Sequence, residues 1–414
     1  MGEALVLGLG DNVDYEIEWD EAVLSALAEA YSVREEELDI HAPIGDERQL
    51  VVSILSFLKS GTGGERFVSS PEVIERFAGR FKNRITLGGT PIRAAIALEK
   101  LGYGAALHFV TMNDHVRRLM PKNCAYITSC EAENVYPHLI VQFTEGARIR
   151  TGLIDIRAAR PNRIIYDNDP ENVEMKLNED FSKFCRDAKV FLISGFNAMQ
   201  SAALLRERIA ALLRIMRALP DSAVVYYEDG GFYDDRLRKI IRDELKDKIH
   251  IHSMNEDELQ GYLGRRVDLL DEAQVASALR DIHGLVGVRS VVVHTRHWAA
   301  AFGGNAAALA PALEGGIALA TTRLRFGDDF TLQAYLDTLA LPEEAKGAAF
   351  ARRLCALLPD ALCVPSKQVA EKNVTTIGLG DAFVGGFLAK LSEVGDHYLY
   401  DDPADVIAAS SQWT

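Results

Sequence analysis

Short apolar segments alternate with helical stretches along the second half of the chain, and this rhythm constrains the fold more than any other feature. The predicted strands are KVFLISG (189–195), AVVYYE (223–228), KIHIHS (248–253) and SVVVHT (290–295). The predicted helices lie near 200–217, 234–245, 255–262, 271–282 and 380–395. Because strands joined by helices usually run parallel, the alternation predicts an α/β fold with a parallel sheet that is covered by helices.

The first half of the chain shows a different pattern. A strand is predicted at 4–9, a helix at 46–61, and a glycine turn that leads into a second helix at 88–104, followed by a strand at 105–112. From about 124 to 166, short alternating segments such as HLIVQFTEG are typical of a β-meander. This change indicates a second, β-rich unit.

The length of the chain also favours two domains. It has 414 residues, and a single hydrophobic core seldom grows beyond about 250–300 residues. We assign residues 1–11 and 168–414, with some helices from 46–105, to a large α/β domain. Residues 12–45 and about 106–167 are assigned to a smaller β-rich lid.

Charge and composition exclude several classes of protein. The net charge of −15 argues against general nucleic-acid binding, which needs a basic surface. No apolar run reaches the roughly 18 residues that a membrane-spanning helix needs. The five cysteines lack C-x-x-C spacing, which favours reduced thiols over disulfides or a zinc site. We expect a cytoplasmic protein without nucleic-acid or membrane partners, and the oligomeric state stays open.

The tetrapeptide GLGD occurs twice, and the residues that follow it differ between the copies. The second copy ends at Asp381 and opens the helical stretch DAFVGGFLAKLSEV. Gly378 and Gly380 let backbone amides converge on one point, and a helix N-terminus stabilises negative charge. Asp381 could accept a proton from a hydroxyl group while these amides hold a phosphoryl group; a plain helix cap is the alternative. The first copy precedes no helix, so no anion hole is expected there and Asp11 is left without a role.

Polar residues follow four of the predicted strands. They are Asn197, Glu228 with Asp229, Asn255 to Glu258, and His294 with Thr295. Because ligands bind at the carboxyl ends of parallel strands, these residues predict a site at that edge of the sheet. Each also has a structural interpretation, since Asn255 could cap a helix and His294 could pack in the core.

Together these segments resemble the ADP-dependent sugar kinases, the ADP-specific glucokinase and phosphofructokinase family of the ribokinase-like superfamily. TTIGLGDAF resembles the family's G-x-G-D signature and MNEDEL its N-x-x-E motif. LISGFNAM, VVVHTRHWA, GGTPIRAA and ARPNRIIYDN also match family segments in the expected order. The resemblance implies a ribokinase-like three-layer α/β/α large domain that binds the nucleotide and a smaller β-rich lid that binds the sugar.

The resemblance also implies roles for single residues. Asp381 is the expected general base, with an anion hole formed by amides around Gly378 and Gly380. Glu258 and Glu228 are expected to hold Mg²⁺ directly or through water. Arg160 or Arg163 is expected to supply positive charge to the transferred phosphoryl group. The expected nucleotide contacts are Asn255, His294, Thr295 and Leu379.

The expected sugar contacts come from other segments. They are Asn12, Asp14, Glu65, Gly88, Gly89 and Asn197. Two departures indicate a divergent branch: Thr90 stands where the family usually has Asn or Gln, and Tyr226 replaces the His of the family's H-x-E segment.

The nature of the sugar rests on opposing signals. Glu65 resembles a Glu of the glucokinase members, and its charge would repel a sugar phosphate. Arg84 and Arg93 could instead receive a phosphate, although Arg93 could equally be a solvated helix residue. We favour an unphosphorylated hexose slightly over fructose 6-phosphate.

The leading hypothesis is a Mg²⁺-dependent kinase that moves a phosphoryl group from ADP to a hexose hydroxyl. One alternative is an ATP-dependent ribokinase-like kinase for another sugar or a nucleoside, because the anion hole and Asp381 would serve either donor. A second alternative is an inactive sugar- or nucleotide-binding protein.

Overall fold

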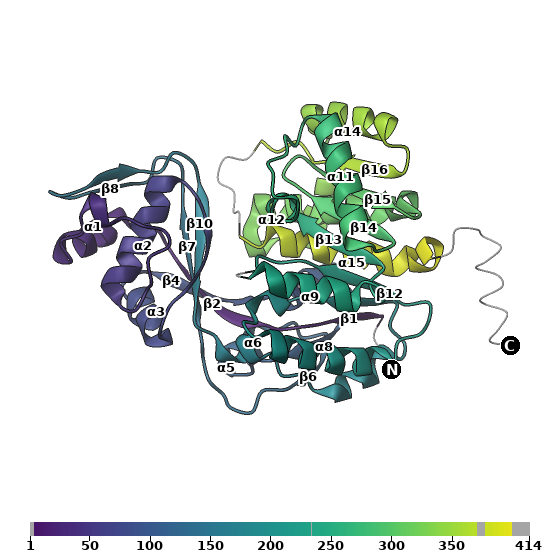
Figure 1. Cartoon of the computed structure of the whole chain (residues 1–414), viewed down its shortest axis with the longest axis horizontal. Helices are drawn as coiled ribbons and strands as arrows, with labels where there is room; N and C mark the ends of the chain where they lie inside the picture. The colour runs from purple at the N-terminus through teal and green to yellow at the C-terminus, as the bar shows by residue number, and fades with distance from the viewer. Residues whose placement is uncertain (1–3, 233, 371–376, 400–414) are drawn as a thin grey trace.

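The protein consists of two lobes that are joined through the region around β2 and β4 (Figure 1). The structure, a computed structural model, describes residues 4–232, 234–370 and 377–399. The large lobe is built on a nine-stranded sheet and the small lobe on a five-stranded sheet. Across the described ranges, no helix combines the length and apolar character that crossing a membrane requires.

The sheet of the large lobe is parallel from β14 to β6, and β15 and β16 extend it in antiparallel orientation. In spatial order its strands are β16 (Ala361–Pro365), β15 (Trp298–Gly303), β14 (Ser290–His294), β13 (Ile251–Asn255), β12 (Val224–Glu228), β11 (Val190–Ile193), β1 (Leu5–Leu7), β5 (Ala106–Phe109) and β6 (Ala125–Thr128).

Helices cover both faces of this sheet, which confirms the three-layer α/β/α prediction. Along β11, Phe191 and Ile193 enter the hydrophobic core on one face, whereas Val190 and Leu192 enter the core on the other. Because both faces are buried, successive strand residues are all apolar. The first core is covered by α8 (Ala202–Met216), α9 (Asp235–Leu245), α10 (Glu256–Leu263), α11 (Glu272–Val286) and α14 (Ala345–Leu357). The second is covered by α4 (Thr90–Lys100), α5 (Asp114–Leu119), α12 (Ala310–Phe326) and α15 (Leu379–Leu399).

The described part of the large lobe has three further helices. They are α6 (Pro170–Glu174), α7 (Ser182–Cys185) and α13 (Leu332–Leu339). Tyr335 of α13 packs in a small core with Ala318 and Leu319 of α12.

The small lobe packs three helices on one face of its sheet and leaves the other face towards the large lobe. Its strands in spatial order are β3 (Gly64–Phe67), β10 (Asn162–Asp167), β7 (His138–Phe143), β2 (Asn12–Ile17) and β4 (Asn83–Gly88). Its helices are α1 (Glu21–Ala30), α2 (Glu47–Ser60) and α3 (Pro71–Ala78), beside a hairpin of β8 (Arg148–Arg150) and β9 (Asp155–Arg157).

The division of the chain between the lobes differs in part from the predicted boundaries. The segment from about 106 was assigned to the lid, but β5 pairs with β1, with Ala106 opposite Val6, so 106–128 belongs to the large sheet. Of the helices in 46–105, some of which we assign to the large domain, α4 covers the large sheet, whereas Leu50 and Ile54 of α2 lie in the core of the small lobe. The sequence pattern of an apolar strand or an amphipathic helix does not specify which of two sheets it joins.

Candidate active site

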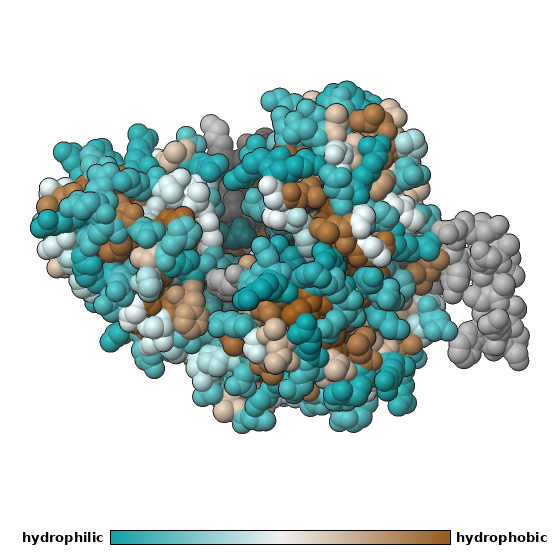
Figure 2. Space-filling view, viewed as in Figure 1, coloured by the Kyte–Doolittle hydropathy of each residue, from teal (hydrophilic) through white to brown (hydrophobic). Residues whose placement is uncertain are grey.

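A cleft with a volume of about 700 Å³ lies between the two lobes, and Figure 2 shows the hollow that it forms in the surface. The carboxyl ends of β11, β12, β13 and β14 lie on one side of it, and β2, β3, β7 and β10 of the small lobe lie on the other. Sixteen of the predicted site residues line this cleft: Asn12, Asp14, Glu65, Gly88, Gly89, Arg163, Asn197, Glu228, Asn255, Glu258, His294, Thr295, Gly378, Leu379, Gly380 and Asp381.

Arg160 is the predicted residue that the cleft lining does not include. Its Nε donates a hydrogen bond of 2.9 Å to the carbonyl of Gly61. The guanidinium therefore anchors the loop after α2, which leaves Arg163 as the arginine of the R-x-N-R segment in the cleft wall.

Asp381 lies in the first turn of α15, where the helix N-terminus faces the cleft. Gly378 precedes it with a φ of 65°, a left-handed conformation that glycine adopts without strain. The hydroxyl of Thr90 donates a hydrogen bond of 2.9 Å to Asp381 Oδ1, and the Arg93 guanidinium lies 3.8 Å from Oδ2. The side chain keeps 23% of its surface exposed, so a ligand in the cleft can reach it.

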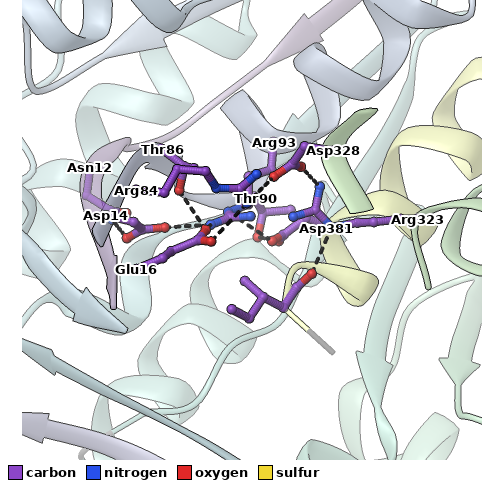
Figure 3. A network of polar contacts seen from close by, with 11 residues as sticks. Asn12, Asp14, Glu16, Arg84, Thr86, Thr90, Arg93, Arg323, Asp328 and Asp381 are labelled. Carbon is purple, nitrogen blue, oxygen red and sulfur yellow. Dashed lines mark hydrogen bonds and ion pairs between the residues drawn. The ribbon is translucent and has the colours of Figure 1, made fainter. Parts of the chain in front are cut away.

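A network of charged side chains connects Asp381 to the small lobe (Figure 3). Arg93 is its centre, with an Nη2 that donates to Asp14 Oδ2 at 2.6 Å and lies 3.4 Å from Glu16 Oε1. Burial opposes the charge of Arg93, but the carboxylates of Asp14, Asp381 and Glu16 outweigh it and raise its pKa. With a side-chain exposure of 8%, Arg93 is not the solvated helix residue that the sequence allowed.

Asp14 is held in place from two sides. Asn12 Nδ2 donates to its Oδ1 at 2.6 Å, and Arg93 donates to its Oδ2. Burial raises the pKa of Asp14, against the opposing effect of Arg93.

Arg84 lies at the outer end of the network. Its Nη2 donates to Glu16 Oε2 at 3.0 Å and to Asp328 Oδ2 at 2.8 Å, and Asp328 also pairs with Arg323. Carboxylates therefore already occupy the two arginines that could have received a phosphate.

Glu228 is buried at the end of β12 and is held by two hydrogen bonds. His294 Nε2 lies 2.9 Å from Oε1, and the Tyr226 hydroxyl donates to Oε2 at 3.2 Å. His294 in turn stacks on Phe383 of α15, with ring centroids 4.6 Å apart. The tyrosine that replaces the family's histidine thus supplies a donor to the same acid.

Glu258 and Asn255 form a capping box at the start of α10. Asn255 Oδ1 accepts from the amide of Glu258 at 3.0 Å, and Glu258 Oε2 accepts from the amide of Asn255 at 2.8 Å. Burial raises the pKa of Glu258 well above its ordinary range, and repulsion from Asp229 and Glu228 adds to the effect. The cap that the sequence offered as an alternative is present, and it places the carboxylate beside two others in the cleft.

The small lobe contributes an acidic wall with one histidine that the sequence did not single out. His138 pairs with Asp14 across β2 and β7, and its Nε2 lies 3.1 Å from Asp169 Oδ2. Burial alone would lower its pKa, but Asp169 and Asp167 outweigh this effect and raise the pKa to about 9. Alternation along HLIVQF indicates that His138 and Ile140 share one face of the strand. It does not indicate whether that face lines the cleft.

Glu65 stands in the same wall. Solvent in the cleft reaches its side chain, although protein atoms surround it closely. Desolvation is the main cause that raises its pKa to about 7, and repulsion from Asp167 is the second.

Comparison with known proteins places this arrangement in a family. Residues 3–389 match the conserved region of the ADP-specific phosphofructokinases and glucokinases. The chain belongs to the ADP-specific phosphofructokinase/glucokinase family. This is a family of ADP-dependent sugar kinases, so the chain is a member of a phosphotransferase family whose phosphoryl donor is ADP. No curated protein sequence matches the chain.

Solved structures of ADP-dependent kinases share the fold. A hypothetical ADP-dependent phosphofructokinase from Pyrococcus horikoshii OT3 has a TM-score of 0.75 at 18% identity, over 95% of this chain and 98% of that one. An ADP-dependent kinase in complex with fructose 6-phosphate and ADPβS has a TM-score of 0.72 at 14% identity, over 95% of each chain. An adenosine kinase from Sinorhizobium meliloti is more distant, with a TM-score of 0.50 at 13% identity, over 95% of this chain and 88% of that one. At these identities the likeness concerns the fold and not the substrate.

Proposed function

We propose that this family member transfers the terminal phosphoryl group of ADP to a hydroxyl of an unphosphorylated hexose, with Asp381 as the general base. The observation that carries the proposal is the position of Asp381 at the N-terminus of α15, opposite Asp14 in the same cleft and joined to it through Arg93. One carboxylate can thus hold the sugar while the other accepts the proton.

The proposed step is a direct in-line transfer. Asp381 takes the proton of the sugar hydroxyl as its oxygen forms a bond to the β-phosphorus, and the bond from that phosphorus to the bridging oxygen breaks, releasing AMP. The amides around Gly378 and Gly380 would stabilise the charge on the transferring group, because free N–H groups at a helix N-terminus favour anions. Arg163, in the facing wall, would add positive charge when the small lobe closes and excludes water.

A divalent cation fits the carboxylates beside the nucleotide end of the cleft. Burial raises the pKa of Glu258, and repulsion from Asp229 and Glu228 raises it further; a bound cation would relieve this repulsion. Within the described ranges, no group of three His, Cys, Asp or Glu side chains could hold a metal ion. Mg²⁺ usually needs only one or two carboxylates beside waters and phosphate oxygens. Glu228 and Glu258 would hold it, and it would neutralise charge on the phosphates.

The acidic small-lobe wall supports a neutral sugar. The ionised form of Glu65 would repel a sugar phosphate, and the cations Arg93 and His138 are already paired with Asp14 and Asp169. Hydroxyl groups suit such a wall because each carboxylate oxygen accepts hydrogen bonds. Asn12, the backbone of Gly88 and Gly89, and Asn197 would complete the sugar contacts, with Asn255, His294, Thr295 and Leu379 at the nucleotide.

The test is a coupled assay that crosses ADP and ATP with glucose and fructose 6-phosphate, with Mg²⁺ or with EDTA. We expect turnover with ADP, glucose and Mg²⁺, and loss of turnover with EDTA. Turnover with ATP alone would overturn the donor, and a higher kcat/KM for fructose 6-phosphate would overturn the choice of sugar. Glu65→Gln is the matched variant, since it should narrow the gap between the two sugars if charge excludes the phosphate.

A further inference from the structure

The first turn of α4 places two side chains on Asp381. Thr90 and Arg93 are three positions apart, so they lie on the same face of the helix. Thr90 Oγ1 is 2.9 Å from Asp381 Oδ1, and Arg93 Nε is 3.8 Å from Oδ2. We propose that Thr90 and Arg93 are positioning residues that fix the plane of the Asp381 carboxylate, an inference that rests on the proposed role of Asp381 as the base.

The hydrogen bond from Thr90 leaves the Asp381 carboxylate able to accept a proton. An ionised carboxylate has about four lone-pair sites, so a single hydroxyl donor on Oδ1 occupies one of them. The remaining sites can accept a proton from a hydroxyl group in the cleft. Because a carboxylate that rotates freely spends little time aligned with the hydroxyl, a fixed plane raises the share of productive encounters.

The position of Thr90 is itself fixed by the turn before α4. Gly89 has a φ of 92°, and a Cβ there would lie 3.1 Å from the backbone of Asp11 and of Gly10. The start of α4 therefore packs closely against the first GLGD segment. This close packing fixes the position of the Thr90 hydroxyl.

Arg93 relates the base to the sugar site. The same guanidinium donates to Asp14 at 2.6 Å and lies beside Asp381, and it also borders Gly378, where an added Cβ would be 2.8 Å from Nη1. Because a guanidinium is a rigid planar fork, it holds the two carboxylates at a fixed separation. The sugar that Asp14 binds is thereby placed at a set distance from Asp381.

A purely structural role for the Thr90 contact is less consistent with the packing of the two helices. One turn after Asp381, Gly385 lies so near α4 that a Cβ would be 3.2 Å from the carbonyl of Ala94. This backbone approach already joins α15 to α4. Removing one hydroxyl should therefore leave the helices in place.

The test compares Thr90→Val, which removes the hydroxyl but keeps the shape, with Thr90→Ser, which keeps the hydroxyl, using ADP and glucose as substrates. We expect Thr90→Val to lower kcat by about 10- to 100-fold, as for the loss of a hydrogen bond to a charged group, with little change in KM for the sugar. Thr90→Ser should retain most of kcat. Thr322→Val is the control, because that buried hydroxyl donates only to the Ala318 carbonyl at 2.7 Å.

Arg93→Lys gives a different expected signature. A lysine cannot span both carboxylates, so kcat should fall and KM for the sugar should rise together. A change in KM without a change in kcat would show that Arg93 does not position Asp381.

Two readouts separate this inference from the proposed function. If Asp381→Asn keeps its kcat, Asp381 is not the base and the proposed function is wrong. If Asp381→Asn is inactive but Thr90→Val keeps its kcat, only the inference is wrong. A crystal structure of Thr90→Val in which Asp381 retains its side-chain conformation would also overturn the inference, whatever the activity.

Discussion

The two GLGD segments share a sequence but differ in backbone conformation and in what surrounds their aspartates. The left-handed glycine is the third residue of the first copy, Gly10 with a φ of 78°, and the first residue of the second, Gly378 with a φ of 65°. Asp11 is fully enclosed, and its Oδ1 accepts from the amides of Val110 and Thr111 at 2.8 and 3.0 Å. Asp381 opens into the cleft at the start of α15.

The element that follows each turn accounts for this difference. β2 follows Asp11, and the side chain turns back to hold the loop after β5. Asp381 lies in the first turn of a helix, so free backbone amides accompany the carboxylate. The same four residues thus brace the fold at one place and form a candidate reaction centre at the other, and variants of each copy can test this contrast.

The largest expected effect comes from Asp381→Asn. An amide cannot accept the proton, and general base catalysis usually contributes about 10²- to 10⁴-fold, so kcat should fall by that order while the thermal unfolding temperature changes little. Steady-state kinetics and a melting curve would measure both. A large loss of stability with retained kcat would show that Asp381, like Asp11, supports the fold rather than the reaction.

Gly378→Ala and Gly10→Ala should separate chemistry from stability. Each forces an alanine into a left-handed conformation, which costs about 1–2 kcal/mol. An added Cβ would lie 2.8 Å from Arg93 Nη1 at Gly378 and 2.7 Å from Asn172 Oδ1 at Gly10. Both variants should lose unfolding free energy in urea, and Gly378→Ala should lose more kcat than Gly10→Ala. Equal losses of kcat would contradict the assignment of the anion hole to the second copy.

The smallest effect is a pH dependence that Asp11 should impart. Burial raises its pKa well above the ordinary value of 3.8, with Asp169 and Glu171 adding to the effect, and its Oδ2 is buried without a hydrogen-bond partner among the described residues. The folded state then binds more protons than the unfolded state above pH 3.8, so this carboxyl makes the unfolding free energy fall as the pH rises.

Asp11→Asn cannot titrate and should remove this contribution. The unfolding free energy of the variant relative to the wild type should therefore increase as the pH rises above about 4, by on the order of 1 kcal/mol for each unit of pKa shift removed. Urea unfolding at several pH values would measure the difference. A difference that stays constant with pH would show that Asp11 keeps its ordinary pKa when folded.

Much of the large lobe could be predicted from the sequence. The strands at 189–195 and 223–228 and the helix at 200–217 correspond closely to β11, β12 and α8, because strands buried on both faces are apolar throughout and their helices have clear caps. The antiparallel strands β15 and β16 were not predicted. Alanine-rich segments such as WAAAFG carry little periodicity, and their pairing depends on partners that are distant along the chain.

The candidate site was predicted as a set of residues but not as a set of contacts. The motifs predicted Asp381, Glu228 and Asp14 as members of one site, and all three line the cleft. They could not identify His138, whose face of β7 depends on how the small lobe is oriented. The motifs also could not show that Arg160 donates a hydrogen bond to the carbonyl of Gly61 instead of lining the cleft.

The sequence by itself determined the three-layer large lobe, the family and the difference in secondary structure between the two GLGD segments, since a helix or a strand at each turn is a local property. Only the tertiary structure decided which sheet 106–128 joins and that Thr90 contacts Asp381, 291 positions away. It also decided that Arg93 is paired rather than solvated. These are contacts between segments far apart in the chain, and they depend on packing that no local pattern encodes.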